Sequence, residues 1–471
     1  MSLTKVSYSM IQGSPVNILD YGASTSSANN TVAIQAALDT GLDVYIPPGE
    51  FICTDTLSMS TPYQTLFGNG KGSQITFTFA SSKIGLIAGK PTNIATDKQT
   101  IRNLYLLGTA NVSKLISVQG PELKILENNI VNISTNGTCI DLEDEDIPTN
   151  TYCFTATIQN NIIRATRTAG TIGIRLGNYH QGTTVSLNLI LNAATLIYIN
   201  GFTTITNINQ NVIEGSVVNN AAILINRSAA TPMYNIHIEN NYFEEHQYII
   251  SLNAGWFENM TITGNYANRN TTVGPRGSSH FFVNTAAASF AGSKDITIDN
   301  NYVVDFETFL GLNDEYSSRL ISIKGNSTPS CTNYSSGTYA NNAYKIRQFN
   351  SFFIKRNVSG SYLSESQLRI ESKDAVFTLP IQFEPHEKMK AIDFVYGPNG
   401  GTGVTVQFFK STSNGITATQ IGTVTTSTAG TSSITVNNYS AEPNYNYYLT
   451  VTYDNTGTSG YIYPFQLYLY E

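Results

Sequence analysis

A recurring asparagine is the feature that most narrows what this 471-residue chain can fold into. Each copy follows a short run with apolar residues at alternate positions, as in Ile236-His-Ile-Glu-Asn-Asn241, and further apolar residues follow it. From Asn211 to Asn326 the copies are 30, 24, 36 and 25 residues apart. This variable period excludes a rigid array, but it suits a solenoid of β-strands whose turns accept insertions. The copies are Asn129, Asn161, Asn211, Asn241, Asn265, Asn301 and Asn326.

The asparagines themselves are predicted to be structural rather than catalytic. Coils of a parallel solenoid stack at the usual distance between strands, about 4.8 Å, so equivalent asparagines would form a ladder of amide groups. Asparagine also suits a tight turn, because its side chain bonds to nearby backbone and it tolerates the left-handed conformation.

The two ends of the chain differ from the repeat region. Residues 31–39 are predicted to form a helix that caps the solenoid, with Val32, Ala33, Ala36 and Ala37 on its apolar side. After about Ala375 the repeat stops, and short alternating strands between Gly and Asn turns predict an antiparallel β-sandwich. The predicted chain is all-β, with residues 1–15 as a short leading segment, residues 16–374 as capping helix and parallel β-helix, and residues 375–471 as the sandwich.

Charge and cysteine content exclude several classes of function. Only 13% of residues are charged and the net charge is −7, so no basic surface for nucleic acid is expected. The four cysteines lack metal-ligand spacing, and we predict no metal site and no cofactor. They are interpreted as scattered thiols, with a Cys139–Cys153 pair as the alternative. The start lacks a signal peptide and no run is long enough to span a membrane, which predicts synthesis in the cytosol and no membrane insertion.

Four segments near the start resemble the opening of the pectate-lyase-like right-handed β-helix superfamily. In that family they form a strand, the capping helix, the first coil and a glycine-rich turn. The resemblance is close over roughly the first 80 residues and rests on the repeat pattern beyond them. It implies a right-handed parallel β-helix, but a fold alone does not determine an activity. The segments are Asn17-Ile-Leu-Asp-Tyr-Gly-Ala23, Ala33-Ile-Gln-Ala-Ala-Leu38, Val44-Tyr-Ile-Pro-Pro-Gly49 and Leu66-Phe-Gly-Asn-Gly-Lys-Gly-Ser73.

Bacteriophage tailspikes and capsule depolymerases often use this version of the fold, so the resemblance implies a function of that kind. The implied protein is a homotrimer on the virion tail, attached to a phage tail or baseplate protein. It binds a bacterial surface polysaccharide, either capsule or O-antigen, and cleaves glycosidic bonds. Three copies of one binding surface would strengthen weak contacts to such a polymer.

A pair of glutamates is the strongest candidate for catalysis. Three residues after each repeated asparagine the side chain should point outward, because residues of a strand alternate between its faces. On two adjacent coils that position holds Glu214 and Glu244, although like charges side by side are unfavourable in a sheet. Carboxyl groups about 5 Å apart match a retaining glycosidase, and about 6.5–9.5 Å an inverting one. The outward column is Asn132, Arg164, an unassigned coil near Asn188, Glu214, Glu244, Asn268 and Val304.

Mutual repulsion in such a pair favours one protonated and one ionised carboxyl, which glycoside cleavage requires. Glu244 has the more crowded neighbourhood and is predicted to be the general acid, with Glu214 as nucleophile or base. The competing interpretation is that both glutamates only solvate the surface. Other candidate acids are Asp305, Glu245, Glu307 and the run from Asp141 to Asp146, which is interpreted as a solvated loop.

Aromatic and basic side chains near the pair are candidate contacts to the polysaccharide. Tyr242, Tyr266 and Tyr302 each follow a repeated asparagine and should form a second column. Aromatic faces stack on sugar rings and their polar edges bond to hydroxyls, although these tyrosines could equally just cover the sheet. The predicted contacts are Tyr242, Trp256, His246, Arg269, Tyr266 and Arg164.

Two other functions stay open from the sequence. A polysaccharide lyase needs a base and a cation, which Tyr242, His246 and Arg269 could supply. A receptor-binding spike would bind the polysaccharide without cleaving it. An esterase is disfavoured, because the sequence contains neither a Gly-x-Ser-x-Gly nor a Gly-Asp-Ser opening.

Overall fold

Two units make up the chain, and the computed structural model describes most of the first. Contacts divide the chain into residues 1–317 with 325–339, and residues 318–324 with 340–471. The described residues are 13–89, 98–118, 120–142, 153–177, 180–201, 203–216, 220–226, 233–254, 257–269, 278–284, 294–312, 321–337, 345–348, 362–364, 367–370, 376–381, 388–398, 403–412, 418–428, 430–440, 445–454, 460–462 and 466–470.

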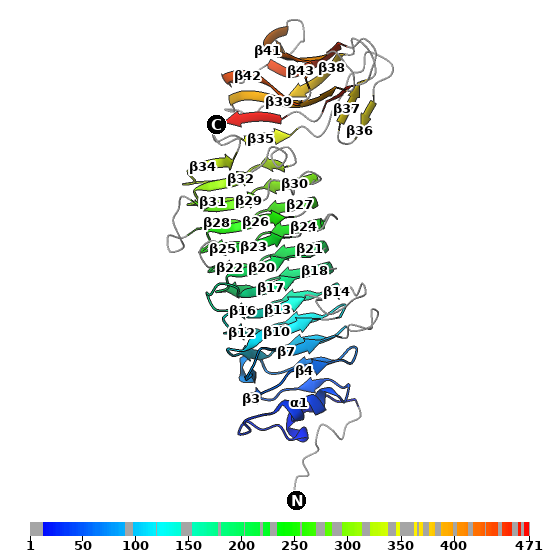
Figure 1. Ribbon diagram of the computed structural model, residues 1–471, viewed down its shortest axis with the longest axis vertical. Helices are drawn as coiled ribbons and strands as arrows, with labels where there is room; N and C mark the ends of the chain where they lie inside the picture. Colours follow the sequence, from blue (N-terminus) through cyan, green and yellow to red (C-terminus); the bar gives the residue numbers. More distant parts are fainter. Residues whose placement is uncertain are drawn as a thin grey trace, which may run out of the picture. The chain divides into compact units, whose positions relative to one another are not determined.

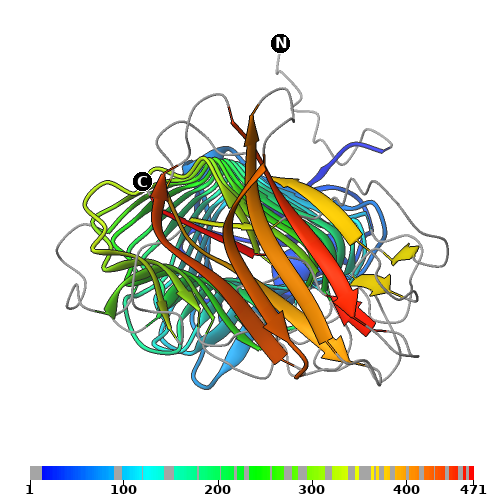
Figure 2. The same ribbon diagram turned by 90° about the horizontal axis from the view of Figure 1, so that it is seen from above.

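The first unit is a solenoid of three parallel β-sheets, and successive coils add one strand to each sheet (Figure 1). Seen end-on, the coils lie over one another (Figure 2). This arrangement confirms the predicted parallel β-helix.

The strands of the three sheets follow one another in chain order around each coil. The first sheet contains β1 (Val16–Asn17), β2 (Val44–Tyr45), β5 (Thr65–Phe67), β8 (Thr100–Arg102), β11 (Lys124–Leu126), β15 (Thr157–Gln159), β18 (His180–Ser186), β21 (Thr203–Asn209), β24 (Met233–Glu239), β27 (Phe257–Thr263) and β30 (Lys294–Asp299), with β14 (Cys153–Phe154) also beside β18. The second sheet contains β3 (Gly49–Cys53), β6 (Ser73–Phe77), β9 (Tyr105–Gly108), β12 (Asn129–Asn132), β16 (Ile162–Arg164), β19 (Leu189–Leu191), β22 (Val212–Glu214), β25 (Tyr242–Glu244), β28 (Tyr266–Asn268) and β31 (Tyr302–Val304). The third sheet contains β4 (Leu57–Met59), β7 (Lys83–Ala88), β10 (Val112–Val118), β13 (Thr138–Leu142), β17 (Ile172–Leu176), β20 (Thr195–Ile199), β23 (Ala221–Asn226), β26 (Tyr248–Ala254), β29 (His280–Asn284), β32 (Thr308–Leu312) and β34 (Asn333–Gly337).

Alternation of side chains fills the interior of the solenoid. In the three-residue strands of the second sheet, the middle residue points inward and its neighbours point out. Burying each large apolar side chain contributes roughly 1.5–3 kcal/mol, and the coils repeat this contribution along the whole unit. The inward column of the second sheet is Phe51, Ile75, Leu106, Ile130, Ile163, Ile190, Ile213, Phe243, Ala267 and Val303, all fully buried.

A short helix, α1 (Thr31–Leu38), lies at the N-terminal end of the solenoid, as predicted (Figure 1). The predicted apolar side is correct at Ala37, which is fully buried, and wrong at Val32, which is 80% exposed. The helix also buries Ile34 and Leu38, four residues apart and therefore on one face. Two short 3₁₀ helices, η2 (Ile18–Tyr21) and η3 (Gly70–Gly72), flank this region in sequence.

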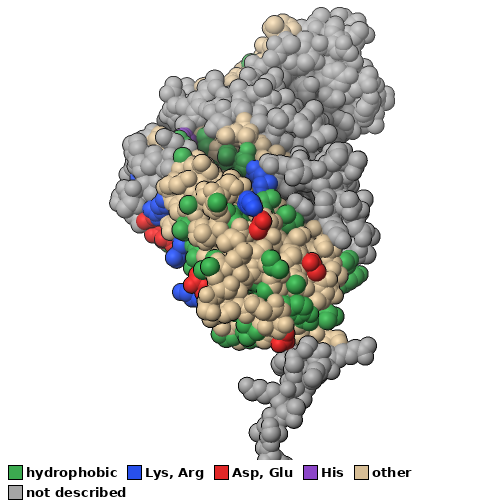
Figure 3. Space-filling view, turned by 60° about the horizontal axis from the view of Figure 1, so that its bottom comes forward, with side chains coloured by type: hydrophobic (Ala, Val, Ile, Leu, Met, Phe, Trp, Pro, Cys, Tyr) green, Lys and Arg blue, Asp and Glu red, His purple; other side chains and the backbone are tan. Residues whose placement is uncertain are grey.

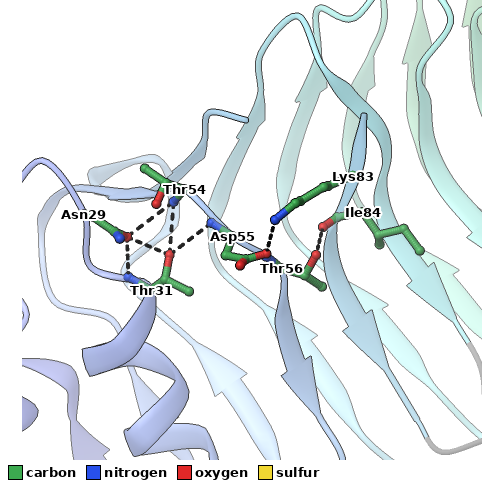
Figure 4. Close-up of polar contacts among 7 residues, drawn as sticks. All are labelled: Asn29, Thr31, Thr54, Asp55, Thr56, Lys83 and Ile84. Carbon is green, nitrogen blue, oxygen red and sulfur yellow. Dashed lines mark hydrogen bonds and ion pairs between the residues drawn. The ribbon is translucent and has the colours of Figure 1, made fainter. Parts of the chain in front are cut away.

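Hydrogen bonds tie the start of α1 to the first coils (Figure 4). The amide of Thr31 donates to Asn29 Oδ1 at 2.9 Å, which satisfies one of the free amides at the helix start. The hydroxyl of Thr31 accepts from the amides of Thr54 at 3.0 Å and Asp55 at 3.2 Å. Asp55 also pairs with Lys83 at 2.7 Å on the exposed surface.

The asparagine ladder is present and fully buried over most of its length. Each amide nitrogen donates to the side-chain oxygen of the next asparagine at 2.9–3.1 Å. The same oxygen accepts the backbone amide of the preceding asparagine. Two assignments from the sequence change: Asn128 replaces Asn129, and the coil near Asn188 contributes Asn188 itself. The ladder is Asn128, Asn161, Asn188, Asn211, Asn241, Asn265, Asn301 and Asn326.

The left-handed turn lies one residue before each ladder asparagine, rather than at the asparagine as predicted. Gln210 and Asn240, for example, have φ of 54° and 55°. Glycine takes this place at Gly264 and Gly325, where a left-handed backbone costs least. The ladder side chain is thereby free to bond along the axis of the solenoid.

The second unit contains two antiparallel sheets, which fits the predicted sandwich. A Cβ built on Gly422 would lie 2.5 Å from Ile434 Cγ2, so the two sheets pack closely there. The predicted boundary at 374 and 375 lies outside the described residues. Two described strands before it pair with C-terminal strands. The larger sheet has β35 (Lys345–Gln348), β36 (Tyr362–Ser364), β37 (Gln367–Ile370), β39 (Lys388–Pro398), β42 (Gly430–Ser440), β44 (Gly460–Ile462) and β45 (Gln466–Tyr470). The smaller has β38 (Val376–Ile381), β40 (Gly403–Thr412), β41 (Ala418–Thr426) and β43 (Tyr445–Asp454), and β33 (Ile321–Lys324) also belongs to this unit.

Three predictions from composition concern surface charge, the cysteines and membrane spans. Charged side chains are few and of both signs on the face shown in Figure 3. Cys139 is a free, buried thiol whose pKa is raised to about 12 by burial, so the alternative pair with Cys153 is not formed. Within the described part of the chain, every helix is too short or too polar to cross a membrane.

Candidate active site

The outer face of the second sheet brings the two predicted glutamates side by side. Strand register pairs Leu191 with Glu214, Glu214 with Glu244, and Glu244 with Asn268. Arg164 pairs with Leu191 in the same column. Both glutamates are half-buried. The predicted pair therefore lies on adjacent coils with both side chains outward.

One member of the predicted column is wrong. Val131 pairs with Arg164, and Asn132 is buried, with its amide donating to the carbonyls of Val112 and Thr138. The error follows from the ladder, because counting three residues from Asn128 gives Val131.

Tyr242 touches the pair directly. Its hydroxyl donates to Glu244 Oε2 at 2.7 Å. This hydrogen bond, with burial and the charge of Glu244, raises the pKa of Tyr242 to about 12. Tyr242 is therefore a protonated donor at neutral pH.

The three tyrosines form the second column that the sequence predicts. Tyr242 and Tyr266 stack with ring centres 5.2 Å apart and planes 4° apart. Tyr266 and Tyr302 stack at 5.6 Å and 10°. Since each ring covers its neighbour's face, Tyr266 has no open face for a sugar to stack on. The column instead offers ring edges and hydroxyl groups to a ligand.

The other predicted acids are not part of the pair. Asp305 lies in a turn with φ of 65°, two coils from Glu244. Asp141 lies in β13 of the third sheet, fully buried between Lys114 and Arg175, and burial raises its pKa. The prediction that Asp141 lies in a solvated loop is therefore wrong. The rest of that run to Asp146 lies outside the described residues, apart from Leu142.

Two predicted sugar contacts are poorly placed for that role. His246 is fully buried, with Nε2 2.9 Å from the carbonyl oxygen of Ile213. Arg269 is only 2% exposed. A third, Trp256, lies outside the described residues, and its role stays a prediction. Arg164 is exposed in the glutamate column and is the basic residue best placed to meet a ligand.

Burial of His246 predicts acid sensitivity of the fold. Burial lowers its pKa from 6.5 to about 4, so between these pH values the unfolded chain binds a proton that the folded chain does not. The contribution of His246 to the free energy of unfolding is therefore fully present above pH 6.5. It is lost as the pH drops towards 4, by on the order of 3 kcal/mol. We expect His246→Gln to reduce this loss in urea unfolding curves compared between about pH 7 and about pH 4.5. His237→Gln, at a half-exposed histidine, is the control, and equal acid sensitivity of the natural and His246→Gln proteins would contradict the prediction.

The sequence did not predict one side chain that lies beside the site. Arg167, in the turn between β16 and β17, contacts Glu245, which follows Glu244 but is 78 residues away in the chain. Only the stacking of coils brings the two together. Among the described residues, no cluster of His, Cys, Asp and Glu is arranged to hold a metal ion.

Comparison with known proteins yields distant structural neighbours. Neither a protein family nor a curated protein matches the sequence. The tailspike protein of Acinetobacter baumannii phage AM24 superimposes with a TM-score of 0.48 and 12% identity, over 97% of this chain and 83% of that one. A hyperthermoactive exopolygalacturonase from Thermotoga maritima gives 0.49 and 10%, over 68% and 88%. A mannuronan C-5 epimerase A-module from Azotobacter vinelandii gives 0.47 and 15%, over 69% and 96%. The activity of this chain therefore has to be inferred from its own site.

Proposed function

We propose that this chain is a depolymerase that hydrolyses glycosidic bonds of a bacterial surface polysaccharide, capsule or O-antigen, at Glu214 and Glu244. The observation that carries the proposal is their register on adjacent strands of one outer face. Adjacent strands lie about 4.8 Å apart, and a retaining glycosidase holds its two carboxyl groups about 5–5.5 Å apart.

The hydrogen bond from Tyr242 suggests which carboxyl plays which role. A hydroxyl that donates to a carboxylate stabilises its negative charge, and Tyr242 donates to Glu244. We therefore propose Glu244 as nucleophile and Glu214 as general acid and base, the reverse of the roles assigned from crowding in the sequence.

These roles give a balanced two-step reaction. Glu244 attacks the anomeric carbon while the glycosidic C–O bond breaks and Glu214 gives its proton to the leaving oxygen. Glu214 then removes a proton from water, the water oxygen attacks the same carbon, and the Glu244 carboxylate is released. Tyr242 keeps its proton throughout and holds Glu244 in place.

The lyase alternative finds less support in the same site. Elimination needs a group that accepts a proton from the sugar, and the pKa of Tyr242 is raised to about 12 by its bond to Glu244. His246 and Arg269 are buried. None of the three groups assigned to elimination is therefore both accessible and suited to it.

The product distinguishes the candidate functions. The protein is incubated with a panel of purified capsular and O-antigen polysaccharides, and reducing ends and ultraviolet absorbance are followed. We expect new reducing ends without an unsaturated, absorbing product. An absorbing product supports the lyase, and retained binding without cleavage supports a receptor-binding spike.

We also propose that the chain works as a homotrimer on a virion tail, attached to a tail or baseplate protein. A stripe of aliphatic side chains on the second sheet supports a partner surface, because exposed apolar patches commonly mark contacts between proteins. Ile162 and Val212 in this stripe are 39% and 38% exposed. Light scattering that gives the mass of a single chain at micromolar concentration would overturn the trimer.

A further inference from the structure

One arginine crosses the turns that follow both candidate catalytic residues. Arg167 Nε donates to Asn192 Oδ1 at 2.9 Å, and Nη2 pairs with the carboxylate of Glu245. Between these two contacts the guanidinium lies over Gly215, where an added Cβ would be 2.2 Å from Nη2. Because Asn192, Gly215 and Glu245 directly follow the register partners Leu191, Glu214 and Glu244, the side chain spans three consecutive coils.

The turn that carries Arg167 is itself held in place. The hydroxyls of Thr166 and Thr168 lie 2.9 Å apart. Thr171 Oγ1 donates to the carbonyl oxygens of both residues, at 2.7 and 2.8 Å. Arg167 therefore reaches across the coils from a fixed base.

The three turns beneath Arg167 have left-handed backbones. Asn192, Gly215 and Glu245 have φ of 58°, 80° and 62°. Asparagine and glycine are common in this conformation, whereas glutamate is not. The amide of Gly215 donates to the carbonyl of Glu244 at 3.0 Å, so a shift of one turn would move the other. The ion pair thus holds an unfavourable turn directly beside Glu244.

We propose that Arg167 is a positioning residue that, through Glu245 and over Gly215, keeps the carboxyl groups of Glu214 and Glu244 in register. This proposal rests on the proposed function of that pair. Arg167 acts on the turns and not on the polysaccharide. The pair with Glu245 is partly exposed, 43% for Arg167 and 19% for Glu245, and such pairs add little to stability. Its removal should therefore change the reaction more than the melting temperature.

The test compares kcat, KM and melting temperature on a polysaccharide of the panel that the natural protein cleaves. Misplacing a catalytic group by about 1 Å can cost about 10²-fold in rate. We expect Arg167→Gln to lower kcat at least about tenfold, with KM within about twofold and little change in melting temperature. Arg167→Lys keeps the charge but loses the fork that reaches both partners, so it should recover only part of kcat.

Glu245→Gln provides the matched variant on the other side of the ion pair. Glutamine keeps the size of the side chain but loses its charge, and it suits the left-handed backbone as poorly as glutamate does, so the fold should survive while kcat falls as in Arg167→Gln. The double variant should lose no more than either single one, because both break one contact. Lys83→Gln removes an exposed ion pair near the N-terminal end and should leave kcat unchanged.

Each result bears on the proposal. A raised KM at unchanged kcat means that Arg167 binds the polysaccharide, and this overturns positioning. Independent losses in the double variant also overturn it, as does a kcat loss explained by an equal loss of folded protein. If the natural protein cleaves none of the polysaccharides, the proposed function fails, and the role of Arg167 in catalysis fails with it.

Discussion

Purified Glu244→Gln and Glu214→Gln proteins are each expected to release oligosaccharide about 10²–10⁴-fold more slowly than the natural protein. The change keeps the shape of the side chain but removes the carboxylate, which must attack carbon or move a proton. The two glutamates are half-buried and outward-facing, so melting temperature should change little. The measurement is the initial rate of reducing-end release at saturating polysaccharide.

Mass mapping of the trapped intermediate assigns the two roles. With a glycosyl fluoride of the same sugar, whose leaving group departs without a proton, the first step does not need Glu214 while the second is slow without it as base, so Glu214→Gln should accumulate a glycosylated peptide that contains Glu244. A glycosylated Glu214 in the Glu244→Gln protein would restore the assignment made from the sequence.

Glu239→Gln is the matched control for both variants. Glu239 lies on β24 of the same coil as Glu244 and is half-exposed, but on the outer face of the first sheet, where it accepts the hydroxyl of Thr261. Its rate should equal that of the natural protein. If both pair variants cleave at near-natural rates, the pair is wrong and the next candidates are Asp305 and Glu307.

Asn241→Leu is expected to lower the free energy of unfolding by on the order of 5 kcal/mol. The amide of Asn241 donates to the carbonyl of Ile208 and to Asn265, and its oxygen accepts two bonds from Asn211. Leucine makes none of these bonds, and each buried polar group left unpaired costs about 1–3 kcal/mol. Urea unfolding followed by circular dichroism provides the measurement.

Asn240→Gly tests whether the ladder is the cause. Asn240 is exposed and precedes the ladder residue with φ of 55°, a conformation that glycine adopts readily. Its substitution should change stability by less than about 1 kcal/mol. Equal losses in the two variants would mean that the turn, and not the amide ladder, sets the stability.

The sequence determined the class of fold because each coil of a solenoid repeats the same local pattern of residues. Alternating apolar residues around Ile213 and Phe243 place one side chain per strand inside the coil. The recurring asparagine fixes where each coil turns. These are local patterns with a period of two, and they were enough to place Glu214 and Glu244 side by side on an outer face.

The local pattern could not decide which of two adjacent asparagines belongs to the ladder. Asn128 and Asn129 are chemically equal candidates for the ladder, and only the bond from Asn128 to Asn161 in the next coil selects the first. That single-residue error moved Asn132 into a column that Val131 occupies, because a shift of one residue exchanges the two faces of a strand.

Contacts between coils decide which other side chains lie near the glutamate pair, and these contacts cannot be predicted from the spacing of residues in the sequence. The insertion lengths of the turns bring Arg167 across Gly215 to Glu245, 78 residues away. Packing of the coil buries His246 against the strand that carries Glu214, although the sequence predicted it as a contact to the polysaccharide. The sequence by itself determined the coil and the outward pair, whereas stacking alone decided which side chains reach that pair, since stacking sets distances between residues that the chain keeps far apart.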